Sequence, residues 1–138
     1  SKRLREKNLY CSTIQLNIKF NTLESIDRQL PLDIATNSTA VIFNKAVEII
    51  DREEINFPIR ALSVRGCNLI NNVVFQESLL GSYRTIRLNK RLDNTIDRLR
   101  EEYGWASIQK GIMLVNRQLS HLNPTDDNTL QKIAFYKG

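Results

Sequence analysis

The sequence has few of the side chains from which metal centres and nucleophilic active sites are built. It contains only two cysteines, Cys11 and Cys67, which form no CxxC pair, and a single histidine, His121. A structural zinc site needs four such ligands at short spacings, so these residues do not predict one. The simplest interpretation of the cysteines is two buried, reduced thiols, with a disulfide or a metal site as the alternative. One histidine supports no Ser-His-Asp arrangement, and no glycine-rich phosphate loop is present.

Adjacent carboxylates, which a nuclease or a polymerase needs for its metal ions, are equally scarce. Asp126-Asp127 is the only adjacent Asp pair, and it follows Pro124 in a turn-like segment where Asp is favoured for backbone reasons. Glu53-Glu54 and Glu101-Glu102 fall at the ends of expected helices, where a solvated role is the more common one. The sequence therefore predicts no active site and no cofactor in this chain.

Long apolar runs are absent as well. No stretch approaches the ~18 residues that a membrane span requires, and no signal peptide is visible, so we expect a cytoplasmic protein without membrane contact. The length of 138 residues fits one domain, or a small domain with an extension, and 41% hydrophobic residues allow a modest core.

The charge favours a polyanionic partner. Lysine and arginine number 20 against 15 aspartates and glutamates, which gives a net charge of +5 and a pI of about 9.4. The charges are spread along the chain and form no block. This composition suits nucleic acid, although many solvated proteins are also moderately basic.

A clean period-two run between residues 13 and 20 predicts a strand with one buried and one wet face. Its apolar members are Ile14, Leu16, Ile18 and Phe20. Residues 21–24 read as a turn, and residues 25–32 read as a second strand, which we expect to be the hairpin partner. Pro31 either ends the pairing of that strand or places it at a sheet edge. The charged segment before this hairpin, residues 1–9, reads as the end of a helix or as a lead-in to the strand.

Residues 37–53 predict a helix and residues 59–69 a third strand. Asn37 or Ser38 can cap the helix. Leu62 and Val64 are expected to face the core. The helix has a wide apolar stripe, formed by Ile42, Phe43, Ala46, Val47, Ile49 and Ile50. The order β-β-α-β indicates an α+β fold, in which one helix covers one face of an antiparallel-rich sheet and leaves the other face open and polar.

The composition changes after residue 70, which suggests three parts: a domain over 1–70, a linker over 71–87, and a helical C-terminal extension over 88–138. The expected helix in the extension carries an apolar stripe and ends at Gly104. The stripe consists of Leu88, Leu92, Ile96 and Leu99.

The open face of the sheet is the first candidate binding site. Polar and basic side chains there could position a phosphate backbone without reading bases, or could form an ordinary solvent face. Few aromatic residues lie on it, which argues against base stacking. The candidates on the face or at its margin are Gln15, Asn17, Lys19, Gln29, Ser63 and Arg65, with Arg28 and Arg60 near strand edges.

The apolar patch over 75–80 is the second candidate. Apolar residues just after a domain edge can dock into a groove on a partner, or can fold back as an extra strand.

These elements together resemble the C-terminal region of Y-family translesion DNA polymerases of the UmuC/DinB type. The third strand matches a pattern of that family, I-x-x-L-x-V-x-x-x-x-L, through Ile59, Leu62, Val64 and Leu69. Residues 91–114, RLDNTIDRLREEYGWASIQKGIML, are similar to the tail of the Gram-positive, UmuC-like branch, where a helix ends in Tyr/Phe-Gly and Ser-Ile-x-x-Gly follows. The resemblance implies that residues 1–70 form a little finger domain.

The same resemblance implies a clamp-binding peptide in the linker. The family usually carries Gln-Leu-Ser/Asp-Leu-Phe at this place, and this chain has Gln76-Glu77-Ser78-Leu79-Leu80. Gln76, Ser78 and Leu79 match, whereas Glu77 replaces a Leu and Leu80 replaces the anchoring Phe. This position favours docking on a sliding clamp over fold-back.

The chain also departs from the family. The family's little finger begins one strand and one helix earlier, so residues 1–9 resemble the last turn of that helix. The catalytic palm and its metal-binding carboxylates are absent, so we expect no polymerisation by this chain alone, with Mg²⁺ used by the parent polymerase. A three-stranded sheet also leaves an unpaired edge, which invites dimerisation of the isolated chain.

The leading hypothesis is therefore the region of an SOS-type translesion polymerase that grips duplex primer-template DNA and recruits the sliding clamp. The alternative is a protein-interaction module, in which the helix over 88–102 and its Tyr-Gly-Trp tail bind a partner such as a recombinase filament without DNA contact. A small nuclease or another enzyme ranks third.

Overall fold

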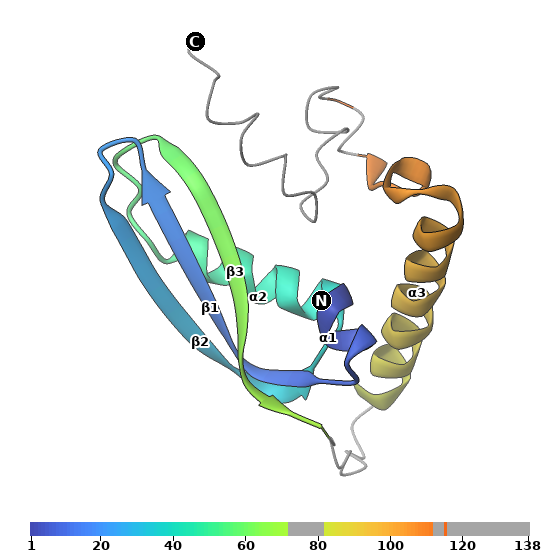
Figure 1. Cartoon of the computed structure of the whole chain (residues 1–138). Helices are drawn as coiled ribbons and strands as arrows, with labels where there is room; N and C mark the ends of the chain where they lie inside the picture. The colour runs from blue at the N-terminus through green and yellow to red at the C-terminus, as the bar shows by residue number, and fades with distance from the viewer. Residues whose placement is uncertain (72–81, 112–114, 116–138) are drawn as a thin grey trace. The chain divides into compact units, whose positions relative to one another are not determined.

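The computed structural model of the chain describes residues 1–71, 82–111 and 115, without the side chains of residues 82–84. It divides into two compact units, Ser1–Asp93 and Asn94–Gly138, which are described separately. In chain order the elements are α1 (Lys2–Glu6), β1 (Tyr10–Phe20), β2 (Ser25–Thr36), α2 (Thr39–Asp51), β3 (Ile59–Ile70), α3 (Ser82–Tyr103) and the 3-10 helix η1 (Trp105–Ser107) (Figure 1).

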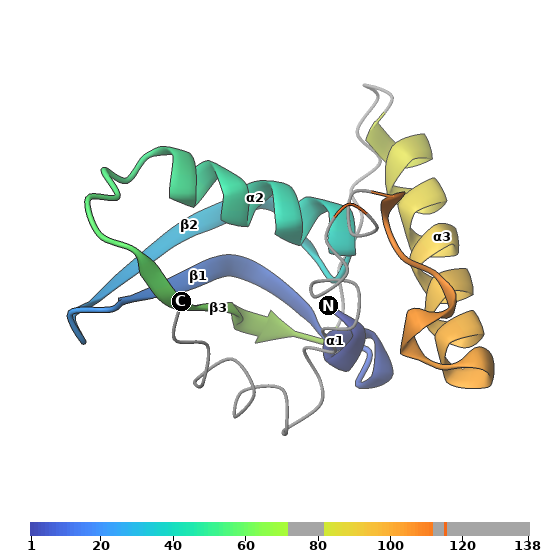
Figure 2. The ribbon, with the colours of Figure 1, turned by 90° about the horizontal axis from the view of Figure 1, so that it is seen from above.

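The sheet has three strands in the order β2-β1-β3, and both pairings are antiparallel. Helix α2 lies along one face of it, which confirms the predicted β-β-α-β arrangement and the α+β class (Figure 2). The segment before the hairpin is the helical turn α1, one of its two predicted forms.

The core lies between β1 and α2. The alternating side chains Ile14, Leu16, Ile18 and Phe20 are buried as predicted, and Ile49 of α2 packs against them. Full burial of a large apolar side chain stabilises the fold by about 1.5–3 kcal/mol, so these residues supply much of the driving force for folding.

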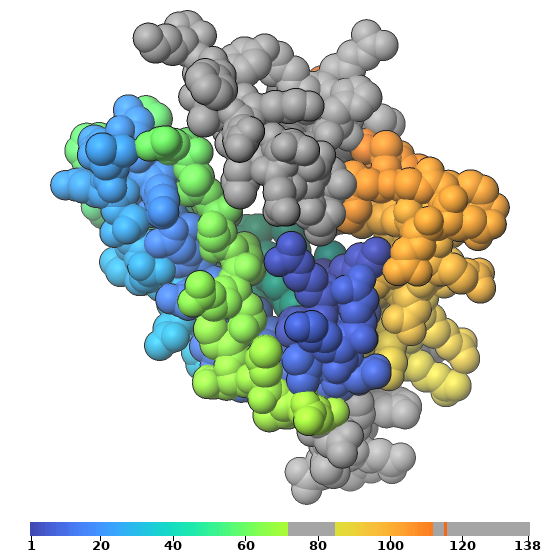
Figure 3. All heavy atoms as spheres, viewed as in Figure 1, coloured from blue at the N-terminus to red at the C-terminus, as the bar shows by residue number. Residues whose placement is uncertain are grey.

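The predicted burial of Leu62 and Val64 is wrong. They stand opposite Ile18 and Leu16, on the helix side of the sheet, yet they are 44% and 48% exposed. A helix is about 10 Å wide and strands lie about 4.8 Å apart, so one helix covers about two strands. Helix α2 covers β1 and β2, and β3 forms a continuous part of the surface (Figure 3). Phe43, assigned to the apolar stripe of α2, is also exposed.

Pro31 lies on an edge strand, which was one of its two predicted roles. It stands opposite Thr13, but β2 continues beyond it to Thr36, four residues farther than predicted. The regular pairing with β1 breaks directly after Pro31, because the next β1 residue with a partner, Cys11, pairs with Thr36. An edge position tolerates the missing N–H of proline.

Helix α2 is capped by a residue far away in the sequence. Ser38 occupies the N-cap position, but its buried hydroxyl has no hydrogen-bond partner in the part of the chain that is described. The Thr39 N–H instead donates to Oδ2 of Asp93 over 2.9 Å. Arg5 Nη1 lies 3.5 Å from the same oxygen and donates to the Asn37 carbonyl over 2.8 Å. The predicted local side-chain cap is therefore replaced by a buried ion pair.

Among the described helices, none is long and apolar enough to cross a membrane.

A close backbone approach at Gly66 gives a test of the fold. A Cβ at this position would lie 2.9 Å from Cys11 Cβ and 3.1 Å from its Sγ, so Gly66→Ala should lower the free energy of unfolding by about 1–3 kcal/mol, through overpacking. Gly111→Ala is the matched control, because a Cβ added at Gly111 would have no atom within 4 Å. Urea unfolding followed by circular dichroism measures both, and equal midpoints would contradict the packing at Gly66.

Candidate nucleic-acid interface

The face of the sheet opposite α2 is lined by cross-strand rows of small, polar and charged residues. Directly paired residues of antiparallel strands lie on the same face, so the pairing of β1 with its two neighbours assigns them. From one end of the sheet to the other, the rows across β2, β1 and β3 are Ser25–Lys19–Ala61, Asp27–Asn17–Ser63, Gln29–Gln15–Arg65 and Pro31–Thr13–Cys67. We call this surface the open face.

The structure brings most of the candidate residues together on the open face. They share it because each alternates with a helix-side residue along its own strand. The residues found there are Gln15, Asn17, Lys19, Gln29, Ser63 and Arg65.

Arg28 does not belong to the open face. It stands opposite Leu16, on the helix side of the sheet, and its Nε donates to Oε1 of Glu53 over 2.7 Å. Glu53, expected to be simply solvated, is thus half of an ion pair. Arg60 is exposed and has no Cα partner in β1, because the pairing shifts there between Lys19 and Phe20.

The cations of the open face are Lys19 and Arg65, and both are exposed. Within the described residues, neither the Lys19 ammonium nor the Arg65 guanidinium has a hydrogen-bond or ion-pair partner. Two cations on a polar face that none of the described helices covers can meet phosphate oxygens with little rearrangement.

The open face also carries a carboxylate that was not among the predicted site residues. Asp27 stands opposite Asn17, and its Oδ1 accepts hydrogen bonds from Asn17 Nδ2 over 3.2 Å and from Gln15 Nε2 over 3.4 Å. The signal was present in the sequence, because the alternation that assigned Gln29 to this face also assigns Asp27, two residues earlier.

The two cysteines are free and lie on different sides of the sheet. Cys67 is half-buried on the open face, and its Sγ lies 3.7 Å from Gln15 Oε1. A pairing irregularity between Cys11 and Thr13 places the Cys11 thiol in the helix-side core. Burial raises the pKa of the Cys11 thiol above its ordinary value. The predicted reduced thiols are confirmed, but only Cys11 is fully buried.

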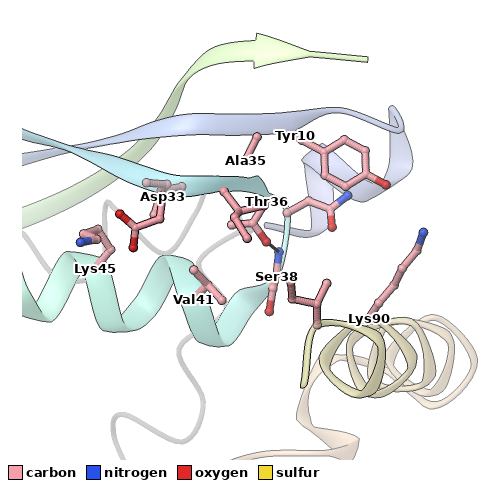
Figure 4. Close-up of a pocket in the computed structure, with 12 residues that line it drawn as sticks. Tyr10, Asp33, Ala35, Thr36, Ser38, Val41, Lys45 and Lys90 are labelled. Atoms are coloured by element: carbon pink, nitrogen blue, oxygen red, sulfur yellow. Dashed lines mark hydrogen bonds between the residues drawn. The ribbon is translucent and has the colours of Figure 1, made fainter. Parts of the chain in front are cut away.

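A cavity of about 200 Å³ lies at the N-terminal end of α2, lined mainly by apolar side chains of β2 and α2 (Figure 4). Thr36 Oγ1 accepts a hydrogen bond from the Ser38 N–H at its margin. Lys45 and Lys90 lie at opposite ends of the cavity, so its charges do not converge on one ligand position. The open face is therefore the better candidate site.

No group of three or more His, Cys, Asp or Glu side chains that could hold a metal ion occurs among the described residues. Asp126-Asp127 and His121 lie outside them, as does the clamp-like peptide Gln76–Leu80.

The Tyr-Gly-Trp tail folds back on the last turns of α3. Gly104, at φ +88°, ends the helix as predicted. The Arg100 guanidinium then lies 4.1 Å from the ring centroid of Trp105 and donates to the Ile108 carbonyl over 2.8 and 3.2 Å. Ser107 Oγ donates to the Gly104 carbonyl over 2.7 Å. This motif is a helix-terminating cap.

Comparison with known proteins finds a family match over the sheet and relatives that match most of the chain. The model of the impB/mucB/samB family C-terminal domain matches residues 1–79. DNA polymerase IV of Acetivibrio thermocellus is 36% identical over 87% of this chain and 31% of the relative's length. DNA polymerase IV of Clostridium acetobutylicum is 32% identical over 81% of this chain and 28% of its own length. The chain thus spans about a third of these relatives. No solved structure matches.

The two thiols should differ in reactivity. The thiolate is the reactive form, so the buried Cys11, with its raised pKa, should resist iodoacetamide at pH 8 while Cys67 is alkylated. Mass spectrometry of the native and the urea-unfolded chain measures this. We expect one modified thiol before unfolding and two after, and none in native Cys67→Ser. Equal rates at both positions would contradict the burial of Cys11.

Proposed function

Because the chain belongs to the impB/mucB/samB family of Y-family translesion DNA polymerases, we propose that its open face grips duplex primer-template DNA and that the peptide after β3 recruits a sliding clamp. The chain is the C-terminal region of such a polymerase. By this proposal it does not polymerise on its own, and it holds the DNA on which the rest of the polymerase acts.

The observation that carries the DNA-gripping role is a pair of exposed cations on a polar face, which have no partner and no covering helix among the described residues. Lys19 and Arg65 stand two rows apart, on adjacent strands. Strand geometry separates adjacent rows by about 7 Å. Lys19 and Arg65, two rows apart, can therefore contact separate phosphates of one duplex.

The same face supports binding that ignores base identity. Its rows contain amide, hydroxyl and charged side chains and no aromatic residue, so it offers phosphate contacts and no stacking platform. Contacts of this kind do not depend on whether a template base is damaged, which suits lesion bypass in the SOS response.

A second candidate rests on α3. Leu88 and Leu92, one turn apart, are 55% and 59% exposed, which fits a protein-interaction surface for a partner such as a recombinase filament. A chain that binds such a partner tightly and shows no DNA binding would favour this function. Within the described residues the outer edges of β2 and β3 pair with no further strand, which favours dimerisation of the isolated chain.

Neutralising the open-face cations should weaken DNA binding and its dependence on salt. For duplex binding, log affinity falls with log salt. We expect Lys19→Gln and Arg65→Gln each to make this negative slope shallower by about 1, and the double variant by about 2. The matched control is Arg52→Gln directly after α2. The Arg52 guanidinium is paired with Glu48, so this substitution should leave the slope unchanged. Fluorescence anisotropy from about 50 to 200 mM salt measures the slopes. Wild-type affinity that does not change with salt would rule out the phosphate contacts.

Clamp recruitment should depend on the Gln76–Leu80 peptide. We expect Gln76→Ala combined with Leu79→Ala to abolish binding to the bacterial sliding clamp, because these residues match the family's docking peptide. Surface plasmon resonance with immobilised clamp measures the loss, and duplex binding in the same preparation should be unchanged. Equal clamp affinity of the double variant and the wild type would eliminate this peptide as the tether.

A further inference from the structure

Asp27 is the one carboxylate in the paired rows of the open face. It stands on the edge strand β2, next to the strand of Lys19 and two strands from that of Arg65. Its row is next to that of Lys19 on one side and to that of Arg65 on the other. A phosphate bound at Lys19 therefore lies one row and one strand, about 8 Å, from this carboxylate.

The carboxylate adds a repulsive interaction to that contact. It offsets one of the two positive charges that Lys19 and Arg65 bring to the paired rows. At about 8 Å and the high effective dielectric of a surface, a like-charge pair weakens binding about two- to sixfold at low salt. The Debye length is about 10 Å at 0.1 M, so the effect should shrink as salt rises.

Asp27 also occupies donors that a phosphate would use. One oxygen, Oδ1, accepts from the side-chain amides of both Gln15 and Asn17, at 3.4 and 3.2 Å. The other side of the Gln15 amide is also engaged, because its Oε1 faces Cys67 Sγ. Each side-chain amide has two N–H donors, so Asp27 takes one from Gln15 and one from Asn17, and a phosphate at the centre of the face must compete with it for these two.

We propose that Asp27 is an affinity-lowering residue of the DNA-gripping face, which repels the phosphate backbone and withholds the Gln15 and Asn17 amides from it. The inference rests on the proposed function and adds that one residue of the same face limits the affinity for DNA. Within one interface, differences in affinity are mostly differences in dissociation rate. Asp27 therefore shortens the lifetime of each contact and restricts the contacts to the rows of Lys19 and Arg65.

Two substitutions separate the two effects. Asp27→Asn removes the charge and keeps an oxygen that accepts from both amides, whereas Asp27→Ala removes the charge and also releases the amides. Asp33→Asn is the matched control: it makes the same chemical change on the same strand, but at a side chain that lines the cavity beside α2 (Figure 4).

The experiment measures duplex affinity and dissociation rate of the full chain and its variants between about 50 and 200 mM salt. We expect Asp27→Asn to bind about two- to sixfold more tightly at low salt, with slower dissociation and a smaller gain at high salt. Asp27→Ala should bind more tightly than Asp27→Asn, and Asp33→Asn should bind like the wild type.

The outcomes distinguish the inference from the proposed function. Unchanged affinity in both Asp27 variants, beside weaker binding of Lys19→Gln, would overturn the inference and leave the DNA-gripping role standing. Equal affinity of Asp27→Ala and Asp27→Asn would overturn the withholding of the amides and retain the repulsion. No effect of Lys19→Gln would refute the proposed function itself. Asp27 is exposed, so all variants should unfold at the wild-type midpoint. If Asp27→Ala is destabilised, the affinity of Asp27→Asn alone tests the inference.

Discussion

Strand β1 is hydrogen-bonded on both sides, and the period-two alternation of its side chains therefore determines both faces of the sheet. Its apolar members, Ile14 to Phe20, form the core under α2, and the residues between them, Gln15 to Lys19, line the open face. A shift of pairing by one residue would expose the core and bury the polar set together. The stability of the fold and the composition of the candidate DNA-binding surface therefore depend on the same register.

Alternation was sufficient to predict the strands, the helix that covers them and the residues of the open face. The alternation did not predict the burial and the ion pairing that depend on tertiary packing. The exposure of Leu62 follows from the width of one helix over three strands, and the pairing of Arg28 with Glu53 joins residues 25 positions apart. A local sequence pattern predicts neither this exposure nor this ion pair. Asp27 is a different case, because the alternation of β2 assigns it to the open face, and only its acidic side chain sets it apart from the predicted phosphate-binding residues.

The residues that identify the family branch and those proposed to touch DNA are separate. The cap at the end of α3 contains Tyr103-Gly104-Trp105 and Ser107-Ile108. In it the Arg100 guanidinium stacks on the Trp105 ring and donates to the Ile108 carbonyl. Such a motif fixes the direction in which the chain leaves α3. The motif depends on a backbone requirement, a positive φ at Gly104, together with one stacking contact. The open face has no comparable signature, because phosphate contacts accept many polar residues.

The capping of α2 by Asp93 links helix formation to the order of synthesis. The acceptor for the Thr39 N–H lies 54 residues farther along the chain, and its partner Arg5 lies near the beginning. During translation β1, β2 and α2 emerge before α3, so the first turn of α2 stays uncapped until the first half of α3 has left the ribosome. The sheet can form early. The beginning of α2 is completed late, and its amide protons would report when that step has occurred.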